Sequence, residues 1–304
     1  MKSILKIILL VWASAVFGSC SKNIFSNGNL TERYETIAEP FLNIEVNDDV
    51  NVTLRRCDND HAAGTIRIET GENLIDDISA IVQKDVIKGR KDSITNRLVI
   101  HNNNSFNYLR PYDCPVDMTV WYDSIYTIFF NSNGVVRTAD PIDGITFFDT
   151  IPIDSITRID SIICKYVLEV QVLGGSGELH LLLNDPLLYT DYMGGTSSIY
   201  AKGYSKFAQT QAKYECHGII NYKELVTRNH HVYNHGTNKI FVNVFSGLKA
   251  ANYNNGEIYY LRYDTTTYDY IPPLPTHQWG TWDSITHHCP EFLELHGGGI
   301  YPLN

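Results

Sequence analysis

The chain has 304 residues, of which 43% are hydrophobic and 19% charged, a balance typical of a folded protein with one large domain or two small ones. Its formal net charge of −10 argues against a nucleic-acid partner, which needs a basic stripe, and against direct adsorption to anionic lipid. The 20 tyrosines and 12 phenylalanines, against 3 methionines, favour strands.

The N-terminal segment is typical of an export signal. Positive charge in "MKSILK" precedes the apolar run "IILLVWASAVF", which is too short to span a membrane, and the small residues Gly18 and Ser19 precede Cys20. This order resembles a bacterial lipoprotein signal, in which the cysteine is lipidated and becomes the mature N-terminus; an ordinary cleaved secretory signal is the alternative. We therefore expect a signal peptide over 1–19, lipid on Cys20 and a polar tether over 20–39.

Five further cysteines follow the signal segment. An exported chain can form disulfides, but an odd number leaves at least one thiol unpaired within the chain. No C-x-x-C motif occurs, so a thioredoxin-like or zinc-ribbon site has no support, and spacing alone does not assign pairs. The five are Cys57, Cys114, Cys164, Cys216 and Cys289.

Alternating apolar residues predict strands through the first half of the chain. The segment "ENLIDDISAIV" is interpreted as strand, with a short helix as the alternative, and 134–170 as a less regular insertion or long loop. The residues of the first run that share one parity are Leu42, Ile44, Val46, Val50, Val52 and Leu54.

The second half repeats with a period near 20 residues. Apolar anchors follow one another at steps of 20, 20 or 21, 21 or 20, and 18 residues: Leu179, Ile199, Ile219 or Ile220, Ile240 and Ile258. A turn precedes each anchor, and its glycine suits a corner that a Cβ would penalise. The predicted turn glycines are Gly175, Gly195, Gly218, Gly236 and Gly256.

This period predicts a β-solenoid, because a coil of this size cannot bury its own apolar face and must stack on its neighbours. Equivalent residues would then form ladders about 4.8 Å apart. A meander or sandwich with evenly spaced hairpins is the alternative. The tail, 264–304, is expected to form a C-terminal extension that caps the open edge.

The order of the motifs "FLNIEVNDDVNVTLRR", "IRIETGENLIDDI", "RLVIHN", "HGIIN" and "GEIYY" resembles the putative auto-transporter adhesin, head GIN domain family. The Gly-Ile-Asn motif of the family name appears here as Gly218-Ile219-Ile220-Asn221, with one extra residue. The resemblance places a domain over 40–263. It implies an all-β, right-handed parallel β-helix-like solenoid in an exported, lipid-anchored protein, and it supplies no catalytic residues.

Motifs that suggest catalysis or metal binding have weak support. "HGGG" near the C-terminus lacks the G-x-S-x-G nucleophile that follows it in lipases. The acid pairs Asp48-Asp49 and Asp76-Asp77 are turn-like, and nothing fixes a carboxylate separation. His230, His231 and His235, and the "HHC" segment at 287–289, are interpreted as surface-loop histidines rather than metal ligands. We expect no enzyme activity, cofactor or metal.

Tyrosines cluster along the repeats and suit a contact surface for carbohydrate or protein, with ordinary strand packing as the alternative. They are Tyr189, Tyr192, Tyr200, Tyr204, Tyr214, Tyr222, Tyr253, Tyr259, Tyr260 and Tyr263.

The triplet Asp-Ser-Ile occurs five times. It resembles an acceptor motif for O-glycosylation in exported proteins of some Gram-negative bacteria, and it also fits a turn that leads into a strand. The expected acceptors are Ser93, Ser124, Ser155, Ser161 and Ser284.

The sequence thus predicts a non-enzymatic adhesin or binding module, held to the outer membrane by lipid, with a carbohydrate or protein ligand. A periplasm-facing structural or signalling-associated envelope protein is the main alternative, and a carbohydrate-active enzyme is a further one.

Overall fold

The computed structural model of the chain describes residues 26–86, 94–104, 114–143, 167–184, 186–262 and 292–303. Within these ranges the chain is all-β, as predicted, with one short 3-10 helix, η1 (Ile75–Asp77). No helix in the described part is long and apolar enough to cross a membrane. The strands are β1 (Leu30–Thr36), β2 (Asn43–Asp48), β3 (Asn51–Arg56), β4 (Thr65–Gly71), β5 (Ile78–Val86), β6 (Ile94–Asn102), β7 (Asp117–Tyr122), β8 (Thr127–Ser132), β9 (Val135–Thr138), β10 (Val167–Val172), β11 (Glu178–Asn184), β12 (Leu187–Tyr192), β13 (Ser198–Ala212), β14 (Ile219–Asn234), β15 (Lys239–Asn252), β16 (Glu257–Arg262), β17 (Phe292–His296) and β18 (Ile300–Pro302).

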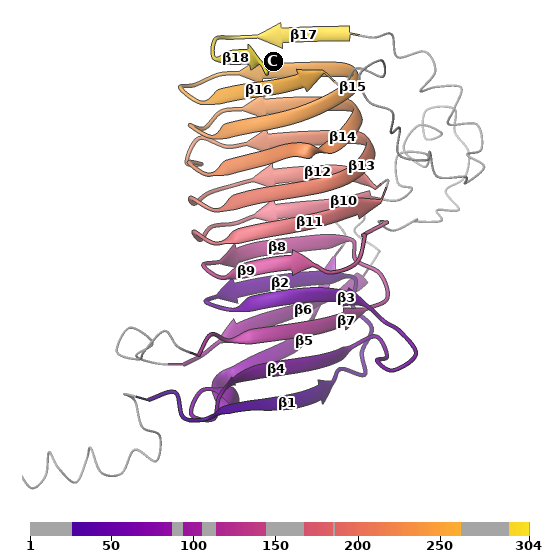
Figure 1. Cartoon of the computed structure of the whole chain (residues 1–304), viewed down its shortest axis with the longest axis vertical. Coiled ribbons are helices and arrows are strands. Elements are labelled where there is room, and N and C mark those ends of the chain that lie inside the picture. Colours follow the sequence, from indigo (N-terminus) through magenta and orange to yellow (C-terminus); the bar gives the residue numbers. More distant parts are fainter. Residues whose placement is uncertain are drawn as a thin grey trace, which may run out of the picture.

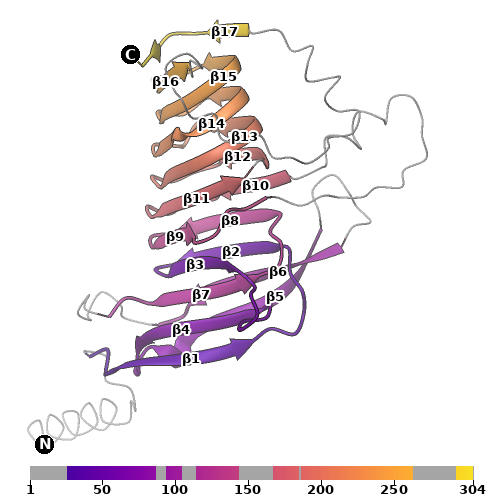
Figure 2. The ribbon, with the colours of Figure 1, turned by 45° about the vertical axis from the view of Figure 1, so that its right-hand side comes forward.

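Most strands pair in parallel, in two ladders that run along the molecule (Figure 1). The β2 ladder contains β2, β8, β10, β12, the C-terminal halves of β13, β14 and β15, and then β17. The β3 ladder contains β3, β9, β11, the N-terminal halves of β13, β14 and β15, and then β16 and β18. From β8 to β16 the chain alternates between the ladders, so each level pairs with the level before it and the level after it (Figure 2). Parallel pairing is what stacking of the repeats predicted.

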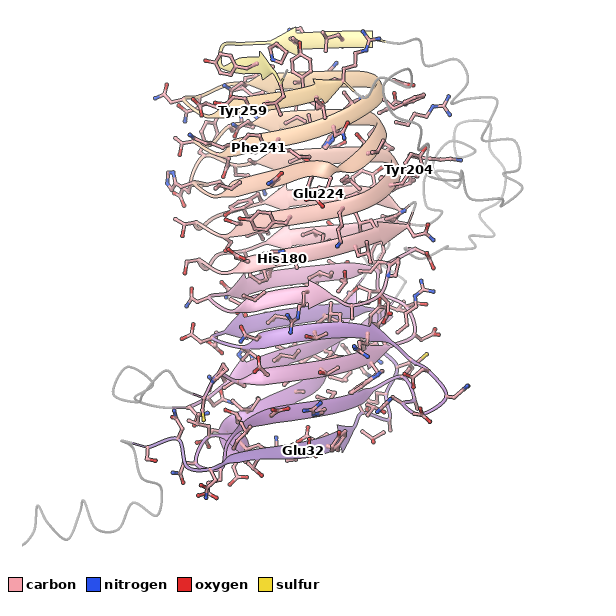
Figure 3. All side chains as sticks on the ribbon, in the orientation of Figure 1. Glu32, His180, Tyr204, Glu224, Phe241 and Tyr259 are labelled. Carbon is pink, nitrogen blue, oxygen red and sulfur yellow. The ribbon has the colours of Figure 1, made fainter. Side chains whose placement is uncertain are left out.

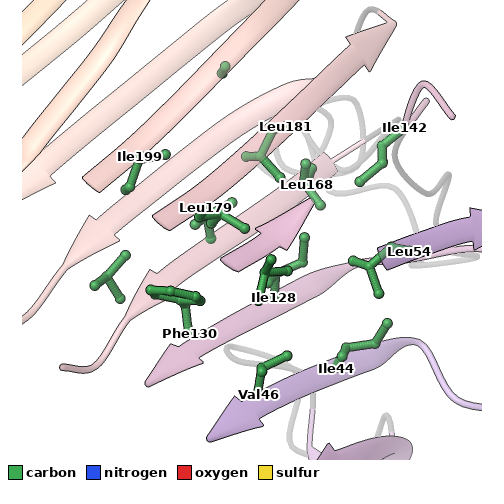
Figure 4. Packing of buried hydrophobic residues seen from close by; sticks show 14 of the residues in the cluster. Ile44, Val46, Leu54, Ile128, Phe130, Ile142, Leu168, Leu179, Leu181 and Ile199 are labelled. Carbon is green, nitrogen blue, oxygen red and sulfur yellow. The ribbon is translucent and has the colours of Figure 1, made fainter. Parts of the chain in front are cut away.

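The apolar core lies between the two ladders. In the β3 ladder, Leu179 pairs with Ile199, Ile199 with Ile220, Ile220 with Ile240 and Ile240 with Ile258, and all five are fully buried. The open choice between Ile219 and Ile220 is therefore settled: Ile220 is the buried anchor, and Ile219 is 39% exposed. Figure 4 shows how residues of both ladders meet, with Ile128 and Phe130 of β8 among those in contact with the same core.

Antiparallel strands close the N-terminal end of the stack. β4 pairs with β7, β1 with β4, and β5 with β6, all antiparallel. Strand β1 falls inside the segment predicted as a tether over 20–39, so part of that segment belongs to the sheet. Exposed and half-buried residues alternate along β1. The half-buried Arg33 donates hydrogen bonds to the carbonyl oxygens of Ile75 and Ile78, both at 2.9 Å, and these bonds hold the strand in the sheet. The segment around "ENLIDDISAIV" contains both predicted alternatives, η1 followed by β5.

The C-terminal end carries β17 and β18, which add one more level to β15 and β16. The C-terminus therefore lies at the opposite end of the stack from β1 (Figure 1). Most of the predicted insertion over 134–170 lies outside the described residues, namely 144–166. Most of the predicted extension over 264–304 also lies outside them, namely 264–291.

The predicted turn glycines sit at corners where successive levels approach closely. Gly175 and Gly195 have φ of 84° and 91°, a conformation that other residues rarely adopt. At Gly218 a Cβ would lie 1.9 Å from the carbonyl oxygen of Ser197, so the close approach of the backbone requires glycine. Gly236 and Gly256 likewise lie against carbonyl oxygens of the preceding level.

Candidate functional site

The outer face of the β3 ladder carries a continuous row of side chains. These residues alternate with the buried anchors, and parallel register places each one over its counterpart on the preceding strand. Going from β3 toward the C-terminal end, the row is Thr53, Arg137, His180, Tyr200, Asn221, Phe241, Tyr259 and Tyr301.

Two ring stacks form within this outer row. His180 and Tyr200 stack with centroids 4.7 Å apart and planes inclined by 13°. Phe241 and Tyr259 stack at 4.9 Å and 12°, and Tyr301 continues the second stack at 5.4 Å. The near-parallel rings follow from the strand spacing, which sets neighbouring side chains about 4.8 Å apart. Figure 3 shows His180, Phe241 and Tyr259 on this one face.

Asn221 interrupts the aromatic row between the two stacks. Its side chain is shorter than the rings on either side, so within the described residues the Tyr200 ring has no aromatic neighbour on that face. The Asn221 Oδ1 atom accepts a hydrogen bond from the Lys223 N–H at 3.2 Å, which leaves the Nδ2 group as a donor.

A bulge in β14 accompanies this interruption. The register with β13 shifts by one residue after Asn221, and the register with β15 shifts between Tyr222 and Val226. Bulges re-aim side chains. Here Lys223 lies over the Phe241 ring, with Nζ 4.2 Å from the centroid, and Glu224 is exposed on the same face (Figure 3).

A groove of about 530 Å³ lies beside the first ring stack and reaches from β9 to β14. Its polar lining combines two cations, Arg137 and Lys202, with the Glu224 carboxylate and the Asn221 amide, beside the rings of His180 and Tyr200. The apolar part of its lining is Val135, Leu181, Leu182 and Ala201, and Thr138 completes it.

Local ion pairs and hydrogen bonds orient the charged groups near the groove. The Arg137 Nε–H donates to Thr53 Oγ1 at 3.1 Å, and His180 Nε2 lies 2.8 Å from the Glu178 carboxylate. Beyond the groove on the same face, Lys239 pairs with Glu257 at 3.3 Å.

This arrangement suits non-covalent recognition of a polar ligand. An open aromatic face binds the apolar face of a ring, and amide, guanidinium and ammonium groups around it supply directed hydrogen bonds. The rigid strands hold these groups in place before a ligand arrives, which lowers the entropic cost of binding.

Some of the tyrosines of the predicted contact surface lie in the core instead. Tyr192 and Tyr222 are fully buried, where the Tyr192 hydroxyl donates to the Ser197 carbonyl at 2.6 Å and burial raises the pKa of both phenols. Packing is therefore their role. A separate group of rings lies at the corners that precede β14, β15 and β16. There the His235 ring contacts Tyr214 on one side and Tyr253 on the other.

The prediction that the histidines occupy surface loops is wrong for His231, which lies half-buried in β14, and for His230. This residue is fully buried in β14, its Nε2 lies 2.9 Å from Thr210 Oγ1, and its ring stacks on Tyr222. Burial, with a smaller effect of His231, lowers its pKa to about 3. Alternation breaks at Asn229 and His230, which are both buried. Among the described residues, no group of His, Cys, Asp and Glu is arranged to hold a metal ion.

Most predicted modification sites lie outside the described residues: Cys20, Ser93, Ser155, Ser161 and Ser284. Ser124 is described and lies half-buried in the turn between β7 and β8, with Ile125 buried behind it. Of the described cysteines, Cys57, Cys114 and Cys216 carry free thiols, and burial raises the pKa of Cys216. Cys164 and Cys289 lie outside the described residues.

Sequence reasoning missed His180, Phe241, Arg137 and Lys202 as members of this face. The signal was present in the repeat itself, because His180, Tyr200, Asn221, Phe241 and Tyr259 each follow their buried anchor by one residue. Reading the position after each anchor would have identified the row.

Comparison with known proteins gives one family. The family model described as putative auto-transporter adhesin, head GIN domain matches residues 40–262. No match was found among curated proteins.

Three solved structures of bacterial proteins match this chain at low sequence identity. The crystal structure of a putative adhesin from Bacteroides fragilis is 14% identical, covers 91% of this chain and 99% of that chain, and has a TM-score of 0.59. A putative adhesin from Parabacteroides distasonis is 15% identical, with 91% and 98% covered and a TM-score of 0.48. A putative lipid binding protein from the same organism is 16% identical, with 92% and 99% covered and a TM-score of 0.47.

Proposed function

Because the chain belongs to the family described as putative auto-transporter adhesin, head GIN domain, we propose that it is an exported, non-catalytic binding module that acts as an adhesin. Its ligand is a carbohydrate or a protein surface. The observation that carries the proposal is the groove beside Tyr200, where an open ring face and hydrogen-bonding groups meet on rigid strands.

The scaffold of this module is proposed to be a right-handed parallel β-helix-like solenoid. Paired buried anchors are separated by 20, 21, 20 and 18 residues along the chain, and this near-constant spacing supports coils that stack on one another. A stack of this kind gives a flat outer face whose side chains repeat at the strand spacing, and such a face suits an extended ligand.

Anchorage to the outer membrane through lipid on Cys20 completes the proposal. The signal-like segment before Cys20 supports it, as does the start of the sheet at β1, which leaves residues 21–29 between lipid and sheet. O-glycans on the Asp-Ser-Ile serines remain a prediction.

The proposal predicts that a screen of glycans and matrix proteins finds a ligand whose binding depends on Tyr200. We expect Tyr200→Ala to weaken binding by about tenfold, because loss of a stacking ring costs roughly 1–1.5 kcal/mol beyond its buried area. The measurement is a titration of the full mature chain with the ligand found in the screen.

The matched control is Tyr214→Ala, which removes an equally large ring that is 69% exposed at a different corner. Its affinity should equal that of the wild type. A screen without any ligand, or equal losses in both variants, would contradict the proposed binding face.

A further inference from the structure

We propose that the C-terminal end of the stack binds a second copy of this chain, through antiparallel pairing of β17 with β17 of the partner. This contact lies apart from the groove beside Tyr200. It goes beyond the proposed function, because it adds a second contact surface and names the partner that the surface fits.

Strand β17 has one edge without a partner strand in the described part of the chain. It pairs with β15, and β18 pairs with β16, so these two strands form the last described level of the two ladders (Figure 1). The N–H and C=O groups along the other edge of β17 can pair with a further strand, as exposed edges do. Pro302 has no N–H group, so β18 is the poorer template of the two.

The apolar core is open at this last level. Leu293 pairs with Leu248, which is only 1% exposed, and therefore continues a buried column. Leu295 likewise pairs with the fully buried Ala250. The two leucines are nevertheless 54% and 38% exposed, and a cavity of about 180 Å³ lies between Leu293, Leu248 and Tyr260. A partner that covers this level must therefore supply a strand and apolar side chains together.

The opposite end of the stack is protected by charged residues. Strand β1 is an edge strand there, and three of its seven residues, Glu32, Arg33 and Glu35, are charged. Charged side chains on an edge discourage pairing with another chain. In β17, by contrast, three of the five residues are Phe or Leu, and the strand contains no Lys, Arg or Pro. The C-terminal end is therefore the end suited to a partner strand.

A second copy meets both requirements when a two-fold axis perpendicular to the sheet relates it to the first. Such an axis makes the two β17 strands antiparallel and keeps the leucines of both copies on the core side. If the axis passes through Leu295, this residue lies opposite the partner's Leu295. Glu294 then lies opposite the partner's His296, so that two carboxylate–imidazole contacts form on the outer face. An axis through Glu294 would instead set two carboxylates opposite each other, which is unfavourable.

Contacts within one chain already show that these groups are compatible. The His296 Nε2 atom lies 2.7 Å from Glu294 Oε1, and the Lys249 Nζ atom lies 3.1 Å from the same oxygen. The outer face of β17 thus carries groups of both signs within reach of one another, and the proposed register adds a second imidazole to each carboxylate.

The geometry of this dimer suits contact between two cells. Strands β1 and β17 lie at opposite ends of the stack, so a dimer through β17 places its two β1 strands at its far ends (Figure 1). With lipid on Cys20 of each copy, the dimer joins two membranes that face each other. This role rests on the proposed anchorage and adhesin function, whereas the dimer itself does not.

The test measures the mass of the full mature chain, prepared without lipid, by sedimentation equilibrium at increasing protein concentration. We expect one monomer–dimer equilibrium. Leu295→Glu should weaken the dimer at least about tenfold, because it sets two carboxylates opposite each other in an apolar contact. Hydrogen exchange gives a second measurement without a variant: the amides of β17 should exchange more slowly in the dimer than in the monomer, and those of β1 should not change.

The control is Leu30→Glu, which adds the same charge at a leucine that is 63% exposed on β1, at the other end of the stack. It should dimerise as the wild type does, and urea unfolding midpoints confirm that both variants are folded. A wild-type monomer at every concentration, equal dimerisation of the two variants, or unchanged exchange of β17 overturns the inference. A series of growing species also overturns it, because it indicates head-to-tail contacts that do not close. None of these results affects the groove, which the Tyr200→Ala titration tests separately.

Discussion

Ile220→Ala is expected to lower the free energy of unfolding by about 2–5 kcal/mol, the usual cost of removing a buried branched side chain and leaving a cavity. Ile220 is fully buried and pairs with Ile199 on the level before and Ile240 on the level after. Backbone pairing on both sides limits how far the strands can collapse into the space. Urea unfolding followed by circular dichroism measures the loss.

The adjacent residue provides the control for this prediction. Ile219→Ala removes the same atoms from the same strand, but Ile219 is 39% exposed and faces outward. We expect its loss to stay below about 1 kcal/mol, the range of strand propensity. Equal losses, or a larger loss at Ile219, would mean that the strand is turned by one residue and that the register described above is incorrect.

The second large effect is a loss of stability on acidification that depends on His230. Burial lowers the pKa of His230 to about 3 in the folded chain, against 6.5 for the unperturbed group. Between these values the unfolded state binds a proton that the folded state does not, so stability is lost as pH falls below 6.5. From pH 7 to pH 5 this single group contributes a loss of about 2 kcal/mol.

His230→Gln isolates this contribution, because the amide is neutral throughout the range and can still bond to Thr210. Its unfolding free energy should fall less steeply between pH 7 and pH 5, by that same amount, whatever its absolute stability. His217→Gln, at an exposed histidine, should keep the wild-type slope. Identical slopes for the wild type and His230→Gln would show that the buried imidazole takes up a proton without penalty.

The core could be predicted where alternation is strict. The first predicted run holds except at Leu42, which is half-buried just before β2. Its other members, Ile44, Val46, Val50, Val52 and Leu54, are each at most 1% exposed, as one buried face requires. The prediction of the repeat anchors also holds, because they too alternate with outward-facing residues. Their spacing is the length of chain needed to return to the same ladder one level further along.

The order of the N-terminal strands could not be predicted in this way. β2 pairs with β8 at an offset of 84 residues and with β6 on its other edge, while β7 pairs with the corresponding edge of β3. Alternation identifies a strand and its buried face but carries no information on which distant strand lies beside it. The antiparallel pairing of β1, β4 and β5 at the N-terminal end could not be predicted either, because these strands are not part of the sequence repeat.

The binding face could be predicted in part. The tyrosine cluster includes Tyr200 and Tyr259 of the outer row, because aromatic residues stand out by type. Lys223 and Glu224 depend on the bulge in β14, which inserts residues at a point where the sequence shows no break in composition. The groove is lined by residues of β9, β11, β13 and β14, and only the three-dimensional register brings these strands together.

The most direct test of the central claim, an adhesin that binds outside the cell, is the accessibility of the native protein to protease on intact cells of its source organism. Protease treatment of permeabilised cells is the positive control, because it shows that the protease can cleave the protein. Survival of a periplasmic protein in the intact cells shows that their outer membrane is not damaged. Digestion on intact cells, with the periplasmic marker preserved, is the result that this account predicts. Digestion only after permeabilisation would contradict it and favour a periplasm-facing envelope protein.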